Sequence, residues 1–167
     1  MRAPALLALS GLTLAVAACN TTNQPMGLSA ASSAAPAPVA HYDWFLHQDG
    51  QEARLAYGLE ESDDLRIGLD CRKNSGRLAL SAVAPEGAAH EIHLESGGDT
   101  ERYPAEAEPS ELNDGLFLTA EAKAGDPVFQ RFRRVGWLAV WQGEDRHAYA
   151  PHPGSSDRVE RFFAFCG

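Results

Sequence analysis

The sequence has few cysteines, no long apolar segment and no motif that identifies a chemistry. Its 167 residues include three cysteines, and none stands in the Cys-x-x-Cys spacing of zinc sites and redox centres. A Gly-x-Ser-x-Gly nucleophile turn and a glycine-rich phosphate loop are also missing. The apolar stretch near the amino terminus, residues 3–14, is shorter than the roughly 20 residues of a membrane-spanning helix. These absences leave the hydrolase, nucleotide-binding and membrane-spanning classes without motif support.

The first 18 residues indicate a secretory signal. Met1 and Arg2 provide a positive start, and a short apolar core follows, which is the three-part form of such signals. The segment leads into Val16-Ala17-Ala18-Cys19, which resembles the lipobox of bacterial lipoproteins. The resemblance implies that residues 1–18 are removed, that the Cys19 thiol receives a diacylglycerol and that the new amino terminus is acylated. We therefore expect a lipid anchor, since several acyl chains hold a protein stably; an ordinary signal with a coincidental cysteine is the alternative.

The segment after the anchor predicts a flexible tether. Residues 20–40 carry no charged side chain and consist mainly of Ser, Thr, Asn, Ala and Pro, a composition that cannot bury a core. Residues 19–40 are therefore the predicted tether, and residues 41–167 are the predicted single globular domain. In Gram-negative bacteria, the lipoprotein resemblance associates Asp after the lipidated cysteine with inner-membrane retention. Asn20 therefore favours the outer membrane.

The chain is strongly acidic. It has 14 Lys and Arg against 23 Asp and Glu, a net charge of -9, and removal of Arg2 with the signal brings the mature chain to -10. Nucleic acids and anionic lipid surfaces are poor partners for that charge. We therefore expect no nucleic-acid partner, and a membrane contact that is made through the lipid anchor.

The two remaining cysteines predict a disulfide. With Cys19 lipidated, Cys71 and Cys166 are left in an oxidising compartment with only each other to pair with. Period-two alternation around Cys71 and helical spacing around Cys166 turn both sulfurs toward the core. Closing a loop of this length stabilises a fold by about 4 to 5 kcal/mol. A redox or metal role is the alternative.

Alternating patterns predict a mainly β domain. Residues 65–71 alternate Leu, Ile, Leu and Cys with Arg, Gly and Asp, as in a half-buried strand. Shorter patterns of the same kind, separated by turns, extend from residue 42 to residue 120, with an acidic edge strand and loops expected at 99–114.

Helical signals stand near the carboxyl terminus. Asp126 followed by proline predicts the start of a helix, and Gly136 predicts its end. A second helix is predicted from Asp157, with Glu160 completing a capping box. The predicted fold class is therefore an antiparallel sandwich or barrel of about seven to nine strands, with two short helices near the C-terminus.

The best candidate for a binding surface is a hairpin predicted over residues 137–150. Trp137 and Trp141 share one face of its first strand, while Leu and Val residues between them take the other. Both faces cannot pack on the same core. Either a late helix covers the second face, or Trp137, Trp141 and Tyr149 form an exposed aromatic strip for an envelope protein or a glycan.

No metal, cofactor or catalytic residue is predicted. His90 and His93 stand three apart on a predicted strand, which turns them to opposite faces. The acidic loop at residues 60–64 offers oxygens for calcium, but it lacks the order of a calcium-binding loop, and a solvated hairpin end is the other interpretation. Carboxylates are abundant enough for a glycosidase, but abundance selects no pair.

The expected function is a membrane-anchored envelope lipoprotein that acts as a non-catalytic binding or assembly module. Two alternatives remain: an inhibitor of a cationic hydrolase such as lysozyme, and an envelope hydrolase. Ser96-Gly97-Gly98 with Arg102-Tyr103 resembles, at a different spacing, the Ser-Gly-x-x-Tyr loop of membrane-bound lysozyme inhibitors, and acidic charge would steer a basic enzyme. The strand ending in Cys71 and the segment 161–167 resemble small secreted proteins of proteobacteria, which implies no activity.

Overall fold

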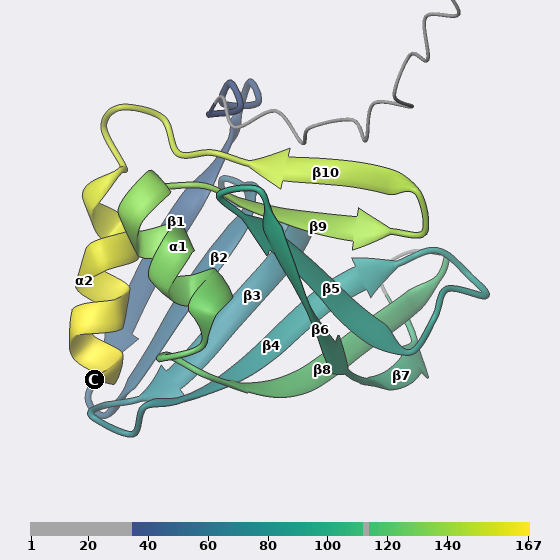
Figure 1. Ribbon diagram of the computed structural model, residues 1–167, viewed down its shortest axis with the longest axis horizontal. Coiled ribbons are helices and arrows are strands. Elements are labelled where there is room, and N and C mark those ends of the chain that lie inside the picture. The colour runs from purple at the N-terminus through teal and green to yellow at the C-terminus, as the bar shows by residue number, and fades with distance from the viewer. Residues whose placement is uncertain (1–34, 112–113) are drawn as a thin grey trace, which may run out of the picture. The chain divides into compact units, whose positions relative to one another are not determined.

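Two antiparallel β-sheets and two helices make up the described part of the chain (Figure 1). The computed structural model describes residues 35–111 and 114–167. The predicted signal peptide, Cys19 and the tether up to residue 34 lie outside the described residues. Within them, the elements are β1 (Tyr42–Asp49), β2 (Glu52–Leu59), β3 (Leu65–Arg72), β4 (Arg77–Ala84), β5 (Glu91–Ser96), β6 (Asp99–Pro104), β7 (Glu106–Pro109), β8 (Leu116–Lys123), α1 (Pro127–Val135), β9 (Leu138–Gln142), β10 (Asp145–Tyr149) and α2 (Asp157–Cys166).

The larger sheet begins with four strands joined by successive hairpins, β1 to β4, and β8 and β7 complete it. Its strand order is β1-β2-β3-β4-β8-β7. The turn between β3 and β4 uses left-handed backbone at Asn74 (φ 57) and Gly76 (φ 62), residue types that adopt this conformation readily. Leu69 and Leu80 face each other across β3 and β4, and both are buried. Alternate side chains of this sheet therefore form one wall of the core.

The smaller sheet, ordered β10-β9-β5-β6, supplies the opposite wall. Leu94 of β5 and Val140 of β9 pair in register and share one hydrophobic core with the larger sheet. A mainly β, sandwich-like fold is thus confirmed. The chain leaves the smaller sheet after Pro104, which has no N–H to donate to a ladder,. It enters β7 after Ala105, whose N–H donates to the His90 carbonyl at 3.0 Å. Two short strands therefore replace the expected edge strand, and the described residues hold ten strands.

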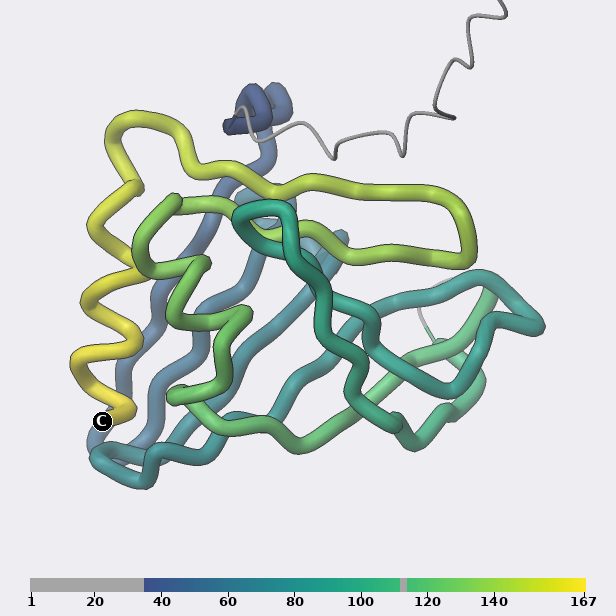
Figure 2. Tube along the Cα trace, in the orientation of Figure 1, coloured from purple at the N-terminus to yellow at the C-terminus, as the bar shows by residue number. Residues whose placement is uncertain are grey.

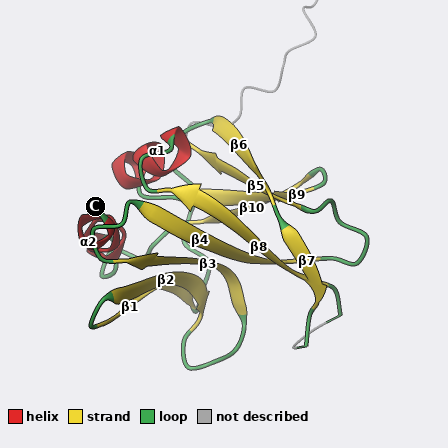
Figure 3. Cartoon of the chain, turned by 90° about the horizontal axis from the view of Figure 1, so that it is seen from below, coloured by secondary structure: helices red, strands yellow, loops and turns green. Residues whose placement is uncertain are grey.

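The two helices lie at the same end of the sheets (Figure 3). As predicted, α1 follows Asp126 and stops at Gly136, whose φ of 80 is left-handed,. The predicted capping box of α2 is wrong. Ser156 occupies the cap position without a capping bond, and Glu160 instead accepts hydrogen bonds of 3.0 and 2.6 Å from Arg133 of α1. Among the described residues, no helix has the length and apolar character needed to cross a bilayer.

The carboxyl end of α2 is fixed to the larger sheet. Cys71 and Cys166 lie at disulfide distance, with their Cα atoms 5.8 Å apart, and both are buried. The N–H groups of Asn74 and Gly76 donate to the carbonyls of Phe165 and Cys166 at 3.0 and 2.9 Å. The predicted proximity of the two sulfurs is therefore confirmed, and it fastens the chain end to the β3–β4 turn.

Candidate functional site

The β9–β10 hairpin, whose backbone path is drawn in Figure 2, has a core-facing side and an outer side according to its register and the residues in the core. Leu138 and Val140 face the core, with Tyr149 opposite Leu138 in the register. Trp141 lies on the outer side of the sheet, where it pairs with His93 of β5. Because successive residues of a strand point to opposite faces, the hairpin separates an inner hollow from an outer one.

The three residues predicted as an aromatic strip do not share one surface. Trp137 is 2% exposed and packs in a small alanine cluster, beneath the guanidinium of Arg146 at 5.1 Å. Trp141 is half-buried and stacks on His93, with ring centres 6.0 Å apart. Tyr149 is 7% exposed on the core-facing side. Binding by these residues stays a prediction, and Trp141 and Tyr149 belong to different hollows.

A buried carboxylate of β5 joins both strands of the hairpin on its outer side. Glu95 is 1% exposed and accepts hydrogen bonds from Trp141 Nε1 at 2.8 Å and from Arg146 at 2.7 and 2.9 Å. Burial alone raises the pKa of Glu95, but the hydrogen bonds from Arg146 and Trp141 bring that pKa below its ordinary value,. Glu95 is therefore ionised at neutral pH and forms an ion pair with the Arg146 guanidinium.

The inner hollow, named here the tyrosine pocket, has a volume of about 750 Å³. Its walls include Tyr42 from β1, Tyr57 from β2 and Tyr149 from β10. The rings of Tyr57 and Tyr149 stack with centres 4.6 Å apart, and those of Tyr42 and Tyr57 are 6.1 Å apart. The polar part of the wall comes from Arg66, Asp114, Gln142, Arg146 and His147. Mostly aromatic and apolar lining with a few fixed polar groups is typical of ligand-binding pockets.

Tyr57 carries the unusual polar atom of this pocket. The residue is 1% exposed, and its hydroxyl makes no hydrogen bond of standard geometry with the described residues. Burial raises its pKa, while a backbone hydrogen bond from Val39, weaker than standard geometry, acts in the opposite direction, so the phenol is neutral. Buried hydroxyls nearly always have a partner. The Tyr57 hydroxyl is therefore placed to receive one from a ligand.

Arg66 joins the acidic loop to the rim of the tyrosine pocket. It donates to the Tyr42 hydroxyl at 2.9 Å and to Asp64 at 3.1 Å, and Tyr42 itself donates to Asp64. The bond to Tyr42 raises the pKa of Arg66. Asp64 thus holds both Tyr42 and Arg66 at the rim of the pocket through hydrogen bonds. Among the described residues, no group of three or more His, Cys, Asp and Glu side chains lies close enough to hold a metal ion.

Two other hollows are less developed as sites. The outer hollow, about 500 Å³, is lined by Trp141 and His93. The His93 Nε2 is buried without a partner among the described residues, and burial lowers its pKa. A third hollow of about 660 Å³ lies on the larger sheet beside Arg54 and Asp70, which form a largely exposed ion pair at 3.8 Å. Of the two hollows beside a buried polar atom that lacks a standard hydrogen bond, the tyrosine pocket is the larger, and we take it as the candidate site.

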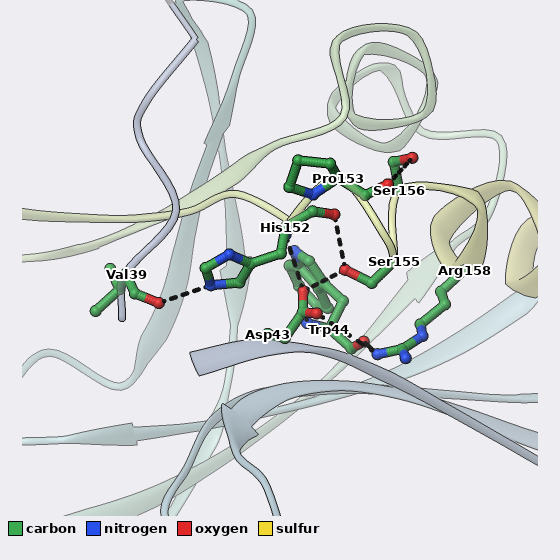
Figure 4. A network of polar contacts seen from close by, with 8 residues as sticks. All are labelled: Val39, Asp43, Trp44, His152, Pro153, Ser155, Ser156 and Arg158. Atoms are coloured by element: carbon green, nitrogen blue, oxygen red, sulfur yellow. Dashed lines mark hydrogen bonds and ion pairs between the residues drawn. The ribbon is translucent and has the colours of Figure 1, made fainter. Parts of the chain in front are cut away.

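Serine, histidine and aspartate also meet next to this pocket (Figure 4), in a cluster that we name the clasp: Asp43, His152, Ser155 and Arg158. Asp43 Oδ1 accepts hydrogen bonds from the Trp44 N–H at 2.8 Å, the His152 N–H at 3.2 Å and the Ser155 hydroxyl at 2.5 Å. Arg158 donates to the Trp44 carbonyl at 2.6 Å and lies 3.6 Å from Asp43 Oδ2. These contacts tie the start of α2 to β1.

The clasp lacks the order of a catalytic triad. In such a triad the imidazole lies between serine and carboxylate, whereas Ser155 donates directly to Asp43. The His152 Nε2 instead lies 3.1 Å from the Val39 carbonyl (Figure 4). Ser155 is also 1% exposed. The cluster therefore positions backbone segments and does not activate a nucleophile.

The segment resembling a lysozyme-inhibitor loop is built into the fold. Ser96 is fully buried and its hydroxyl donates to the Trp137 carbonyl at 2.8 Å. Gly97 and Gly98 form the β5–β6 turn with φ of 63 and 91. Tyr103 is 8% exposed, and its hydroxyl lies within hydrogen-bond distance of two carboxylate acceptors, Glu101 at 3.0 Å and Asp126 at 3.2 Å. The serine and tyrosine of this segment thus serve internal contacts.

Tyr42, Tyr57 and Arg66 were not predicted as site residues. Tyr57 follows Ala53 and Leu55 on the inward face of its strand, so it is expected in the core. The sequence signal that could have identified Tyr57 was an aromatic residue with a polar hydroxyl group, placed at the end of a strand just before an acidic loop. That signal locates neither Tyr149 nor Val39 beside it, because both come from distant parts of the chain.

The chain was also compared with known proteins. No family model, curated protein or solved structure matches it. The functional argument therefore depends on the residues and geometry of this chain.

Proposed function

We propose that this chain is a lipid-anchored envelope protein whose β-sandwich domain is a non-catalytic binding or assembly module. The observation that carries the proposal is the tyrosine pocket, where the Tyr57 hydroxyl is buried without an ordinary hydrogen bond. An unsatisfied buried hydroxyl costs about 1–3 kcal/mol of stability, which a ligand hydrogen bond recovers. In the clasp, Ser155 donates directly to Asp43 and has no histidine between them to act as a base. This arrangement supports binding in preference to hydrolysis.

The anchor is supported by sequence. Val16-Ala17-Ala18-Cys19 resembles a lipobox, and Asn20 favours the outer membrane, on its periplasmic or surface face. Val39, near the end of the proposed tether, lines the tyrosine pocket. The pocket therefore includes a residue from the described end of the proposed tether, and its proposed partner is an envelope protein or a glycan.

Lipidation is tested by expressing the full chain and its Cys19→Ser variant in a Gram-negative host. We expect the intact mass of the unaltered protein to include the diacylglycerol and the amino-terminal acyl chain, and the protein to fractionate with the outer membrane. Thioether formation requires sulfur, so the variant should lose both properties. Membrane partitioning of Cys19→Ser contradicts the anchor.

Binding is tested by affinity capture from detergent-solubilised envelope with the full lipoprotein. Tyr57→Phe removes the unpaired hydroxyl, and Tyr103→Phe removes a tyrosine hydroxyl that is bonded within the fold, so it serves as the matched control. We expect a component that the unaltered protein and Tyr103→Phe retain and Tyr57→Phe loses. Equal recovery with all three proteins contradicts the pocket as the binding site.

A further inference from the structure

The outward side of the larger sheet carries a row of charged residues whose sign changes once. Residues of this sheet that belong to the core alternate along each strand with residues that point outward,. Next to the β3–β4 turn, the outward residues of the first four strands are Asp49, Glu52, Arg72 and Arg77, in the order β1 to β4. All four are exposed. The row is therefore acidic on β1 and β2 and basic on β3 and β4.

These charges are weakly paired within the chain. Among the described residues, Asp49, Glu52 and Arg72 form no ion pair. Arg77 pairs with Glu121, and both side chains are more than 70% exposed. Exposed pairs of this kind contribute little to stability. Exchanging them for pairs with another molecule therefore costs little.

A second row on the same side lies one step further from the turn. It consists of His47, Arg54, Asp70 and Ala79, again in the order β1 to β4. The charged atoms of Arg54 and Asp70 are 3.8 Å apart, and both side chains are more than 40% exposed. The two rows line a hollow of about 660 Å³. We name the surface that these two rows form the outer sheet face.

A second copy of the chain matches the first row when two outer sheet faces meet about a twofold axis. An axis parallel to the strands and between β2 and β3 places β1 opposite β4 of the other copy, and β2 opposite β3. Each acidic residue of one copy then meets a basic residue of the other, with contacts between Asp49 and Arg77 and between Glu52 and Arg72. An axis one strand to either side brings residues of like charge together. The first row therefore selects a single axis.

The second row fits the same axis. Arg54 lies opposite the partner's Asp70, and this contact occurs twice because of the symmetry. His47 lies opposite the partner's Ala79, where the small side chain leaves room for the imidazole ring. Two rows with different residue orders thus agree on one axis.

Small residues beyond the second row allow the two sheets to approach each other. Ala56 of β2 and Gly68 of β3 are register partners, and both are buried. A Cβ atom at Gly68 would lie 2.9 Å from the guanidinium of Arg54, so glycine lets Arg54 lie flat across the sheet. This third row therefore presents a low surface to a facing sheet, and packed sheets lie about 10 Å apart.

The size of the face predicts a weak dimer. The four strands have eight residues each, and they cover roughly 500 Å² at about 4.8 Å between strands and about 3.3 Å per residue. Two copies bury about 1,000 Å², which is the lower limit of specific interfaces. The negative charge of the chain opposes association, but salt screens charges that lie more than about 8 Å apart. Anchoring of both copies in one membrane raises their effective concentration.

We propose that the outer sheet face joins two copies of this chain in a twofold dimer, with the acidic half of each face on the basic half of the other. The dimer goes beyond the proposed binding function. Tyr57 belongs to the core, on the opposite side of the larger sheet, so the second copy does not cover the tyrosine pocket. The capture experiment therefore tests the pocket, and the association measurements below test the dimer independently.

The test is sedimentation equilibrium of the full lipoprotein in a density-matched detergent, with micelles in excess over protein chains. We expect a reversible change from the mass of one chain to the mass of two as the protein concentration rises, with a dissociation constant on the order of 100 µM. Protein that stays monomeric at about 1 mM overturns the proposal.

Charge reversal locates the interface. Glu52→Arg and Arg72→Glu each place like charges at two contacts of the dimer, and we expect either variant alone to associate at least about tenfold more weakly. An equal mixture of the two variants should associate as the unaltered protein does, because the introduced arginine of one copy meets the introduced glutamate of the other. A mixture that stays monomeric overturns the proposed contacts.

Glu108→Arg is the matched control. It makes the same change of charge as Glu52→Arg, at an exposed position of β7 that lies outside the four strands of the interface. We expect Glu108→Arg to associate as tightly as the unaltered protein. Equal weakening by Glu108→Arg and Glu52→Arg, or no weakening by Glu52→Arg, overturns the outer sheet face as the interface.

Discussion

The clasp and the tyrosine pocket are neighbours around residues 39–44, yet their buried polar atoms are in opposite states. In the clasp, Asp43 accepts three hydrogen bonds on one oxygen and has Arg158 beside the other. In the pocket, the Tyr57 hydroxyl is buried without an ordinary hydrogen bond. Satisfied polar networks make a structure rigid, whereas a partly satisfied one costs stability. The comparison separates groups that hold the fold from a group that is available to a ligand.

The largest expected effect tests the groups that hold α2. The clasp fixes the start of this helix and the cysteine pair fixes its end. Replacing both Cys71 and Cys166 by Ser should lower the free energy of unfolding by about 4 to 5 kcal/mol, because the unfolded chain gains the entropy of an open loop. Urea denaturation of oxidised and variant protein measures this. A loss below about 1 kcal/mol would show that the clasp alone secures α2.

The hairpin between the two hollows gives the next effect. Trp137 is buried in its alanine cluster and belongs with the fold-holding groups. Trp137→Ala should cost about 4 kcal/mol because it leaves a large cavity. Trp141→Ala removes a half-buried ring and should cost clearly less. Thermal unfolding of both variants checks the order, and a greater loss for Trp141 contradicts it.

Breaking the clasp comes third. Asp43→Ala removes the acceptor of the Trp44 and His152 N–H groups and the carboxylate beside Arg158, so we expect a loss of about 3 kcal/mol in the free energy of unfolding. Asp49→Ala, at an exposed position of the same strand, is the matched control and should change it by less than about 0.5 kcal/mol. Equal chemical denaturation curves for the two variants would remove the structural role of the clasp.

Local patterns predicted much of the fold that these variants test. Period-two alternation identified the strand that ends at Cys71, and helical spacing identified the helix that ends at Cys166. The pairing of distant elements was harder, because β8 joins β4 only after the chain has passed through β5 and β6 of the smaller sheet and returned to the larger sheet at Ala105. The burial of Trp137 likewise depends on Arg146, which covers its ring from β10. The residue pattern of one strand does not indicate that a side chain from a neighbouring strand will cover it.

The site shows the same limit more strongly. Tyr149 was singled out beside two tryptophans, but its ring partner is Tyr57. These two tyrosines stand on strands of different sheets, and only the packing of the sheets brings them together. A hydroxyl that lacks a partner cannot be recognised before its neighbours are known.

The ion pair between Glu95 and Arg146 should contribute to stability in a pH-dependent way, whereas uncharged contacts should not. Hydrogen bonds overcome burial and hold the pKa of Glu95 below its ordinary value of 4.5. Its contribution to stability is therefore present above about pH 4.5 and is lost as the pH falls through the lower folded-state value. Glu95→Gln should lower the free energy of unfolding by about 2 kcal/mol at neutral pH. Urea denaturation at neutral pH and at about pH 3 should show the difference from the unaltered protein shrinking in acid; a constant difference contradicts an ionised Glu95.

The smallest expected effect on stability is the sharpest test of the comparison. Tyr57→Phe removes a hydroxyl that makes no ordinary hydrogen bond and keeps the ring stacks with Tyr42 and Tyr149. The free energy of unfolding should stay within about 1 kcal/mol or rise, because a desolvated polar group is lost. Ser155→Ala, which removes an equally buried but bonded hydroxyl, should cost more. Urea denaturation decides the order: if Tyr57→Phe is the more destabilising variant, the Tyr57 hydroxyl already has a partner in the folded chain, and its availability to a ligand is refuted.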